Sequence, residues 1–485
     1  MEITSPTSSV GDPRRWWILA VMLTAEIMDL LDSTIVNVAG PSLKHDLGVS
    51  AQELQWIIGG YALALGAFLI LGGRLGDRFG RRQMFLFGVI TFTISSLLCA
   101  VAPTTGWLII FRLVEGVAAA MLLPQGFGLI RQAFPPAEFG KAFAVFGPVF
   151  GLGGILGPII GGFIIQANLF NIGWRMVFVV NIPIGIVATA LAFVMLPRQR
   201  GDRSVSIDLL GVVVVAAAAG LLVLPLIQGQ QAGWPLWTWL CFLGSALGFG
   251  IFVLRNRAVA AKGKTPLVDP AIFSYSSYTT GLGGLFLFFS GFTGVYLVVT
   301  LFLQIGQGYS ASGAALGNIP IALGTALGGM LSGAVLAEKF GRKVLQIGGA
   351  LQIVGALVLL IGLRDVAHFH LLQIIPGMVI SGFGTGLVVA ALFDTIISAI
   401  AGSAVGSASG VLSAVQSIAS SVGVAVFGTA FFAGVTDHNS AVLGFRNSLY
   451  IQIAFVAVFV GLTFLLPKGQ KQNAWEDNVE GLPVS

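Results

Sequence analysis

Long apolar runs separated by short polar segments cover nearly the whole chain. Several long runs contain no Asp, Glu, Lys or Arg, among them 142–174, 209–254 and 270–337. Each is longer than the ~20 residues that cross a bilayer core, so the two longest must turn and cross twice. The pattern predicts fourteen membrane-spanning helices, at about 16–39, 54–72, 84–102, 107–130, 140–165, 174–196, 208–228, 235–254, 279–304, 312–336, 344–362, 371–396, 405–432 and 447–466.

A short polar segment recurs between apolar runs in the two halves of the chain. Gly73 to Arg82 reads GRLGDRFGRR, and Ala334 to Lys343 reads AVLAEKFGRK. Both end in an acid, a base, a phenylalanine, a glycine and two bases, and each copy follows the second span of its half. Such a repeat is typical of a transporter built from two homologous halves.

The fold class predicted from this repeat is an all-α integral membrane protein with two six-helix bundles and an inserted two-helix hairpin. Two extra spans keep both halves in the same orientation, as parallel repeats require. We expect a cytoplasmic tail at 1–15, bundles at 16–197 and 265–467, linkers and hairpin at 198–264, and a second cytoplasmic tail at 468–485.

Charge is scarce and unevenly placed. Charged residues make up 9% of the chain, against about 25% in soluble domains. Of the 25 lysines and arginines, only Lys44, Arg175, Arg364 and Arg446 fall on the outer side of the predicted topology, and Arg112 lies within a span. The net charge of +5 is therefore an orientation signal that puts both termini in the cytoplasm, and we expect no nucleic-acid partner.

The residues that usually hold cofactors are few. Cys99 and Cys241 both lie in apolar runs, so no disulfide or metal site is predicted. The segment Lys262 to Thr265 lacks the upstream glycine of a phosphate-binding loop. We expect no cofactor and no ATP, and an ion gradient as the energy source.

Three acids lie in the first span, at Glu26, Asp29 and Asp32. A spacing of three residues places them on one helix face. An ionised acid near the bilayer centre costs about 2.5–3.5 kcal/mol. We therefore expect the three to face a wet interior cavity, where at least one exchanges a proton; the alternative is that they only bridge to other helices.

A buried base lies in the fourth span, which holds Arg112 and Glu115. Counting the rise of two antiparallel helices places Arg112 near the depth of Asp32, and Glu115 nearer that of Glu26. We expect Asp32 and Glu115 to compete for the guanidinium, so that protonation decides which pair forms. The alternative is a static structural ion pair.

The fifth span is rich in glycine around one proline. Gly153, Gly157, Pro158, Gly161 and Gly162 belong to the run GGILGPIIGG. Small residues allow helices to approach closely, and a proline kinks a helix. We expect this span to pack tightly against its neighbours.

Five ordered segments resemble motifs of the fourteen-helix drug:proton antiporters of the major facilitator superfamily. They are Leu31–Ala39 followed by Pro41, Gly73–Arg82, Arg112–Gly116, Gly153–Gly162, and Trp174-Arg175 with Asn181–Gly185. The third motif departs from the family pattern, since Glu115 replaces the usual glutamine. The resemblance extends over the whole chain.

The resemblance implies roles for the matching residues. Asp32 and Arg112 correspond to the embedded pair implicated in proton coupling. The gating motif maps onto Gly73, Asp77, Arg78, Gly80 and Arg81, and the antiporter motif onto the glycines and proline of the fifth span.

The function predicted from these features is secondary active transport, not enzyme catalysis. We expect proton-coupled export of a lipophilic drug-like molecule, cationic ones included, across a bacterial plasma membrane by a monomer working through alternating access. Its partners are protons, the small lipophilic substrate and the lipid bilayer. The alternative within the same fold is a dedicated exporter of one endogenous metabolite or antibiotic, and a non-transporting membrane receptor is less favoured.

Overall fold

The computed structural model describes residues 13–134, 146–168, 171–198, 201–203, 207–263, 266–364, 370–397, 405–438 and 440–466. Most of the expected tail at 1–15 and all of the tail at 468–485 lie outside these ranges. Within them every regular element is a helix, as predicted. The long helices are α1 (Arg15–Ile35), α3 (Ala51–Phe79), α4 (Arg81–Ala100), α5 (Thr105–Ala133), α7 (Phe146–Ala167), α9 (Asn181–Met195), α10 (Leu209–Gln228), α11 (Leu236–Ala261), α12 (Ser276–Leu301), α14 (Ile319–Leu331), α16 (Arg342–Gly362), α17 (Ile375–Ile397), α18 (Val405–His438) and α19 (Ala441–Thr463).

Twelve helices in the described part of the chain are long and apolar enough to cross a membrane. The chain is therefore a multi-pass membrane protein. Two more long helices stand outside that set. One is α1, which carries three acids, and the other is α7, which begins directly after residues outside the described ranges.

Several helices are longer or more broken than the apolar runs indicate. Helix α3 continues through the polar motif to Phe79, and α11 continues past its expected end at 254 to Ala261. The expected tenth span divides at Asn318 into α13 (Ala311–Gly317) and α14, and a π-helical turn follows at Ser332–Leu336. The expected sixth span divides into a short 3-10 turn (Gly173–Arg175), α8 (Met176–Val179) and α9.

Local sequence explains where helices begin and end. Ser50 accepts a hydrogen bond from the Glu53 amide, and the Glu53 carboxylate accepts one from the Ser50 amide, which together cap the start of α3. At the other end Gly80 has φ 101° and ψ 132°, a backbone conformation that side chains with a Cβ avoid, so α3 stops there and α4 begins.

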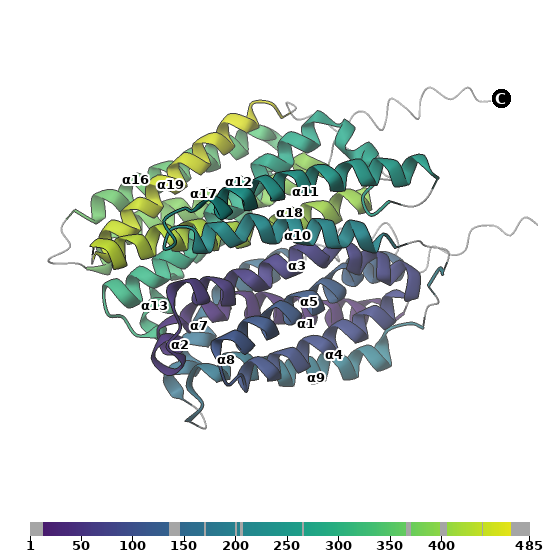
Figure 1. Ribbon diagram of the computed structural model, residues 1–485, viewed down its shortest axis with the longest axis horizontal. Helices are drawn as coiled ribbons and strands as arrows, with labels where there is room; N and C mark the ends of the chain where they lie inside the picture. The colour runs from purple at the N-terminus through teal and green to yellow at the C-terminus, as the bar shows by residue number, and fades with distance from the viewer. Residues whose placement is uncertain are drawn as a thin grey trace, which may run out of the picture. The chain divides into compact units, whose positions relative to one another are not determined.

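The chain forms two compact units. The first contains 1–270, 289–319 and 409–448, and the second contains 271–288, 320–408 and 449–485. Within the first unit α3 packs against α5, α4 against α5, α1 against α7 and α9, and α10 against both α11 and α3. Figure 1 shows these helices running side by side, with α10 next to α3. Within the second unit α16 packs against α17.

Candidate functional site

The buried charges of the first unit meet at Arg112 on α5. One of its nitrogens, NH1, lies 2.5 Å from Asp32 Oδ2 on α1 and 2.8 Å from Glu115 Oε2 one turn along α5. Its Nε donates to the Ile57 carbonyl of α3 at 3.1 Å. All three ionisable side chains are at most 1% exposed. We call Asp32, Arg112 and Glu115 the charge centre.

An asparagine completes the coordination of Asp32. The Asn181 amide on α9 donates to Asp32 Oδ1 at 2.9 Å and to Ser96 Oγ on α4 at 3.0 Å. Ser96 in turn donates to the Phe178 carbonyl at 3.1 Å. Both oxygens of Asp32 are thereby held, one by the guanidinium and one by the amide, so four helices fix the position of this carboxylate.

Glu115 is held less completely than Asp32. Its Oε2 accepts from Arg112 and lies 3.6 Å from the Cys99 sulfur. Its Oε1 is buried and has no hydrogen-bond partner among the described residues. Two carboxylates therefore share one guanidinium, so the charge centre has net charge −1 if both are ionised and is neutral if one carries a proton.

A tyrosine joins the second acid of α1 to the charge centre. The Tyr61 hydroxyl on α3 donates to Asp29 Oδ1. The guanidinium of Arg112 lies 4.3 Å from the centroid of the Tyr61 ring, a distance at which a cation is attracted to the ring face. Asp29 thus reaches the charge centre through one aromatic ring.

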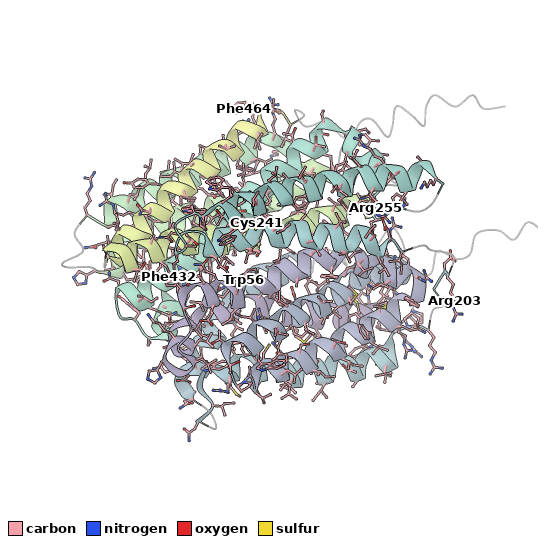
Figure 2. All side chains as sticks on the ribbon, in the orientation of Figure 1. Trp56, Arg203, Cys241, Arg255, Phe432 and Phe464 are labelled. Atoms are coloured by element: carbon pink, nitrogen blue, oxygen red, sulfur yellow. The ribbon has the colours of Figure 1, made fainter. Side chains whose placement is uncertain are left out.

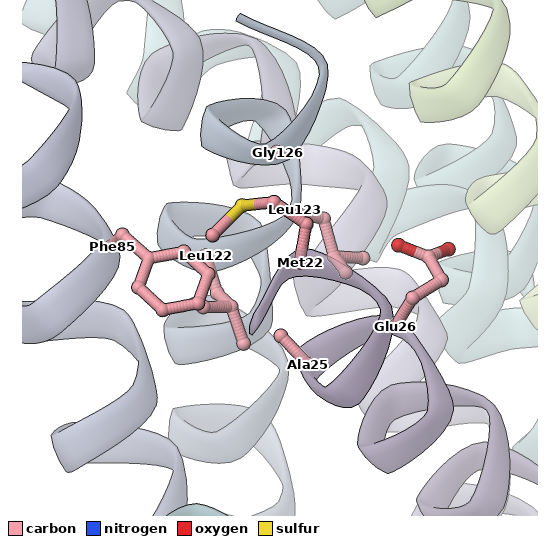
Figure 3. Close-up of a pocket in the computed structure, with 7 residues that line it drawn as sticks. All are labelled: Met22, Ala25, Glu26, Phe85, Leu122, Leu123 and Gly126. Atoms are coloured by element: carbon pink, nitrogen blue, oxygen red, sulfur yellow. The ribbon is translucent and has the colours of Figure 1, made fainter. Parts of the chain in front are cut away.

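Glu26 lies one turn before Asp29 on α1. It lines a small cavity with Met22, Phe85, Leu122 and Gly126, among others, as Figure 3 shows. The cavity volume is about 10 Å³, room for roughly one water molecule. In Figure 3 Glu26 and Phe85 lie on opposite sides of the cavity.

The geometry confirms some expectations and corrects others. Arg112 does lie at the depth of Asp32. Asp32 and Glu115 both contact the same nitrogen of Arg112 in this structure, and the competition between them stays a prediction. Glu26 lies opposite Leu122 to Gly126, two turns beyond Glu115, so the depth expected for Glu115 is wrong. Nor do the three acids share a wet cavity, since Asp32 is 0% exposed.

The glycine-rich helix α7 packs against the helix that carries the acids. A Cβ at Gly157 would lie 1.9 Å from Thr34 Oγ1, and one at Gly161 would lie 2.5 Å from Ile35 Cγ1. Both positions therefore favour glycine where α7 touches α1, two and three residues beyond Asp32. A Cβ at Gly162 would lie 2.7 Å from the Ser312 Cα of α13.

The other antiporter-motif residues also belong to α7. Pro158 is inside the helix, next to Gly157. Gly153 belongs to the same helix, one turn earlier. Gln166 accepts a hydrogen bond from Ser312, close to the Gly162 contact.

The gating motif is mostly helical instead of a loop. Gly73, Asp77 and Arg78 belong to the last two turns of α3, Gly80 makes the turn, and Arg81 begins α4. Arg81 and Asp77 form an ion pair at 2.6 Å, with 25% and 38% of the two side chains exposed. The motif also contacts the segments just before and just after the inserted hairpin. The Asp202 amide donates to the Asp77 carbonyl at 2.9 Å, and Arg74 donates to the Pro266 carbonyl at 2.7 Å.

The two copies of the repeat hold the last helix of their own half in a similar way. Arg82 donates to the Phe193 carbonyl near the end of α9 at 2.9 Å. Arg342 donates to the carbonyls of Phe464 and Leu466, just after α19, at 3.0 and 2.6 Å. An arginine side chain at the carboxyl end of a helix satisfies carbonyls that the helix leaves free.

Three features define a membrane transporter built from two related halves. The helices pack around a buried charge centre, glycines of α7 contact α1, and in each half an arginine of the repeated motif bonds carbonyls at the end of the last helix. The chain belongs to the Major Facilitator Superfamily, whose model matches residues 22–424. This confirms the superfamily expected from the motifs, and the chain is a transporter and not an enzyme.

Relatives and solved structures agree with this assignment. The "Probable actinorhodin transporter" of Streptomyces coelicolor is 42% identical over 88% of this chain and 74% of its own length. The puromycin resistance protein of Streptomyces alboniger is 34% identical over 94% and 91%. The tetracenomycin C resistance and export protein of Streptomyces glaucescens is 33% identical over 87% and 77%. A D-xylose–proton symporter structure shares the fold, with a TM-score of 0.66 at 16% identity over 94% of this chain and 99% of that one.

Sequence reasoning missed two members of the site. Tyr61 and Asn181 were not among the expected site residues, yet they bind Asp29 and Asp32. A signal was present for Asn181, which is an amide inside an otherwise apolar run and belongs to one of the family-like segments. Tyr61 gave only a weak signal, because a tyrosine in a membrane helix is common.

Proposed function

We propose that this protein exports lipophilic drug-like molecules, cationic ones included, in exchange for protons. The observation that carries the proposal is the imbalance of the charge centre, where two buried carboxylates share one guanidinium. Burying an unpaired charge is costly. The buried charge centre is therefore favoured with one proton bound to one of its two carboxylates. When the bundles rock and water reaches the centre, that proton can leave.

The proposed topology has fourteen spans, with α1 and α7 added to the twelve helices above. Bundles at 16–197 and 265–467 alternate in access, the hairpin and its linkers occupy 198–264, and the tails at 1–15 and 468–485 are cytoplasmic. Figure 2 supports the proposed orientation, since Arg203 and Arg255 lie toward the same end of the first unit. We propose a bacterial plasma membrane as the location and a monomer as the working form.

Each group of predicted site residues has a role in this proposal. Asp32, Arg112 and Glu115 bind and release the coupled proton, and Asp29 and Glu26 extend the titratable path along α1. Gly73, Asp77, Arg78, Gly80 and Arg81 gate the cytoplasmic side. The glycines of α7 keep α1 in place during the motion.

A second candidate is the dedicated export of one endogenous metabolite or antibiotic. It is favoured by the names of the three relatives, each of which refers to a single compound. A panel of unrelated toxic compounds separates the two, because a multidrug exporter protects a host from several of them and a dedicated exporter from one chemical type.

Dye efflux from an efflux-deficient bacterial host tests the proposal. Wild type should lower dye accumulation, an uncoupler should abolish the effect, and Asp32→Asn should remove it at equal expression. Efflux that persists in both the uncoupled cells and the Asp32→Asn cells contradicts proton antiport.

A further inference from the structure

An apolar groove lies between the inserted hairpin and the first bundle. Its walls come from α3, α5 and α10, and its volume is about 290 Å³. The lining residues are all apolar: Leu63, Ala64, Ala67 and Phe68 of α3, Leu113, Val114 and Val117 of α5, and Ala216 of α10. All of them belong to the first compact unit.

The groove exists because small side chains occur where larger ones would fill it. Ala64, Ala67 and Ala216 carry a single methyl group each, and Val117 faces them from α5. These positions fall near the middle of helices that are 29, 29 and 20 residues long. The groove is therefore at the depth of the hydrocarbon core.

The groove opens to the bilayer. Val114 on its wall is 42% exposed, and Val213, one turn before Ala216 on α10, is 62% exposed. No polar side chain lines the walls, so water would find no hydrogen-bond partner there, whereas apolar guests enter such spaces readily. In a multi-pass membrane protein the apolar material beside this opening is lipid.

We propose that the groove binds one acyl chain of a membrane phospholipid as a lasting part of the structure. The acyl chain would fill the space between α10 and the α3–α5 pair. There it would make the van der Waals contacts that the short alanine side chains cannot make with one another. On α5 it would lie against Leu113 and Val114, the residues between Arg112 and Glu115 in sequence. The occupied groove would thus support the helix that carries the charge centre and attach the inserted hairpin to it.

Photocrosslinking in nanodiscs tests this site. The probe is a phosphatidylglycerol with a diazirine in the middle of one acyl chain, and peptide mass spectrometry locates the adducts. Wild type should give adducts on 63–68 and 113–117. Ala216→Phe should reduce them at least five-fold by filling the groove, whereas Leu247→Phe, which adds the same ring to the exposed surface of α11 away from the groove, should leave them unchanged.

Two results overturn the proposal. One is labelling of these segments that is no stronger than that of an exposed helix face such as the one carrying Ile94, which is 53% exposed. The other is labelling that Ala216→Phe does not lower while size-exclusion profiles show both variants folded. A further arm adds tetraphenylphosphonium in excess, and loss of the adducts in that arm assigns the groove to lipophilic cations and contradicts a resident lipid. Each readout is independent of export activity.

Discussion

Arg112 satisfies more partners than any other side chain of the charge centre. It bonds Asp32, Glu115 and the Ile57 carbonyl, and its guanidinium lies over the Tyr61 ring. Removing one member of a buried ion pair leaves a charge without compensation, which is more damaging than removing the whole set. The stability of a variant that lacks only Arg112 can therefore be compared with that of a variant that lacks all three charges.

We predict that Arg112→Met destabilises the protein by about 3–5 kcal/mol, because Asp32 and Glu115 are left buried without a cation. The triple variant with Arg112→Met, Asp32→Asn and Glu115→Gln should recover much of this loss. Thermal unfolding of the detergent-solubilised protein measures both. A triple variant that melts no higher than Arg112→Met would contradict the charge balance.

Asn181 is expected to tune export through Asp32. Asn181→Ala removes the hydrogen bond to Asp32 Oδ1, a contact to a charged group worth about 1.5–3 kcal/mol. We predict an export rate at least ten-fold lower at saturating substrate. Asn256→Ala is the matched control, since Asn256 is a buried amide whose partners are the Phe252 carbonyl and the Val268 amide, away from the charge centre, and it should cost less. Equal rates for wild type and Asn181→Ala would remove this residue from the site.

At the scale of elements, α1 is fixed by what packs on each side of it. Helices α3, α5 and α9 supply its polar partners, and α7 supports it through glycines. The polar contacts need α1 in one position, and the glycine contacts leave no room for it to shift towards α7. The position of Asp32 thus depends on how all of these helices pack around α1.

Gly157→Ala should disturb this packing. Its Cβ would overlap Thr34 Oγ1, and overpacking costs typically 1–3 kcal/mol. Gly220→Ala on α10 is the matched control, because nothing lies within 4 Å of its Cβ. We predict a lower melting temperature and weaker export for Gly157→Ala, and neither effect for Gly220→Ala. The same result for both variants would contradict the packing argument.

The base of the inserted hairpin is held by a bidentate ion pair. Arg255 Nε lies 2.8 Å from Asp208 Oδ2, and Arg255 NH2 lies 2.6 Å from Asp208 Oδ1. Burial raises the pKa of Asp208, but hydrogen bonds from Arg255 and from the Gly211 amide outweigh it, so the net pKa is below the usual value. The pair therefore stabilises the fold above the unfolded pKa of about 3.9, and its contribution is lost as pH falls through the lower folded pKa.

This gives a prediction with a definite sign. Asp208→Asn should have a lower melting temperature than wild type at pH 7, and the difference should be small because Arg255 is partly exposed. The difference should shrink as the pH is lowered below about 4. Melting curves of both proteins across this range provide the measurement, and a difference that grows on acidification is the opposite of what the pair predicts.

The apolar runs predicted nearly all the long helices, because a helix that crosses a bilayer needs about 20 consecutive, mainly apolar residues. They did not predict that α3 runs to Phe79, because the charges of Gly73–Arg82 read as a loop, whereas Gly72 and Gly76 keep that stretch packed on α5. Arg112 and Asp32 were paired correctly because a buried base needs an acid. Tyr61 could not be assigned from sequence, since its role depends on its hydroxyl lying within hydrogen-bond distance of Asp29, a residue on another helix.

At the scale of the whole molecule, the repeat organises the transporter. Each half holds its last helix with an arginine from the repeated motif, and the first copy also bonds the segments just before and just after the inserted hairpin. The hairpin is therefore tied to the first bundle at the end where Arg74 and Asp77 lie. In the proposed cycle it moves with that bundle.

The central claim is that the charge centre exchanges a proton for substrate. Proton release from the detergent-solubilised protein, followed with a pH-sensitive dye in weak buffer, tests it most directly. Addition of a transported compound should release protons from wild type and few or none from Asp32→Asn, with binding retained. Equal release from the two proteins, or none from wild type when the compound binds, would contradict the account.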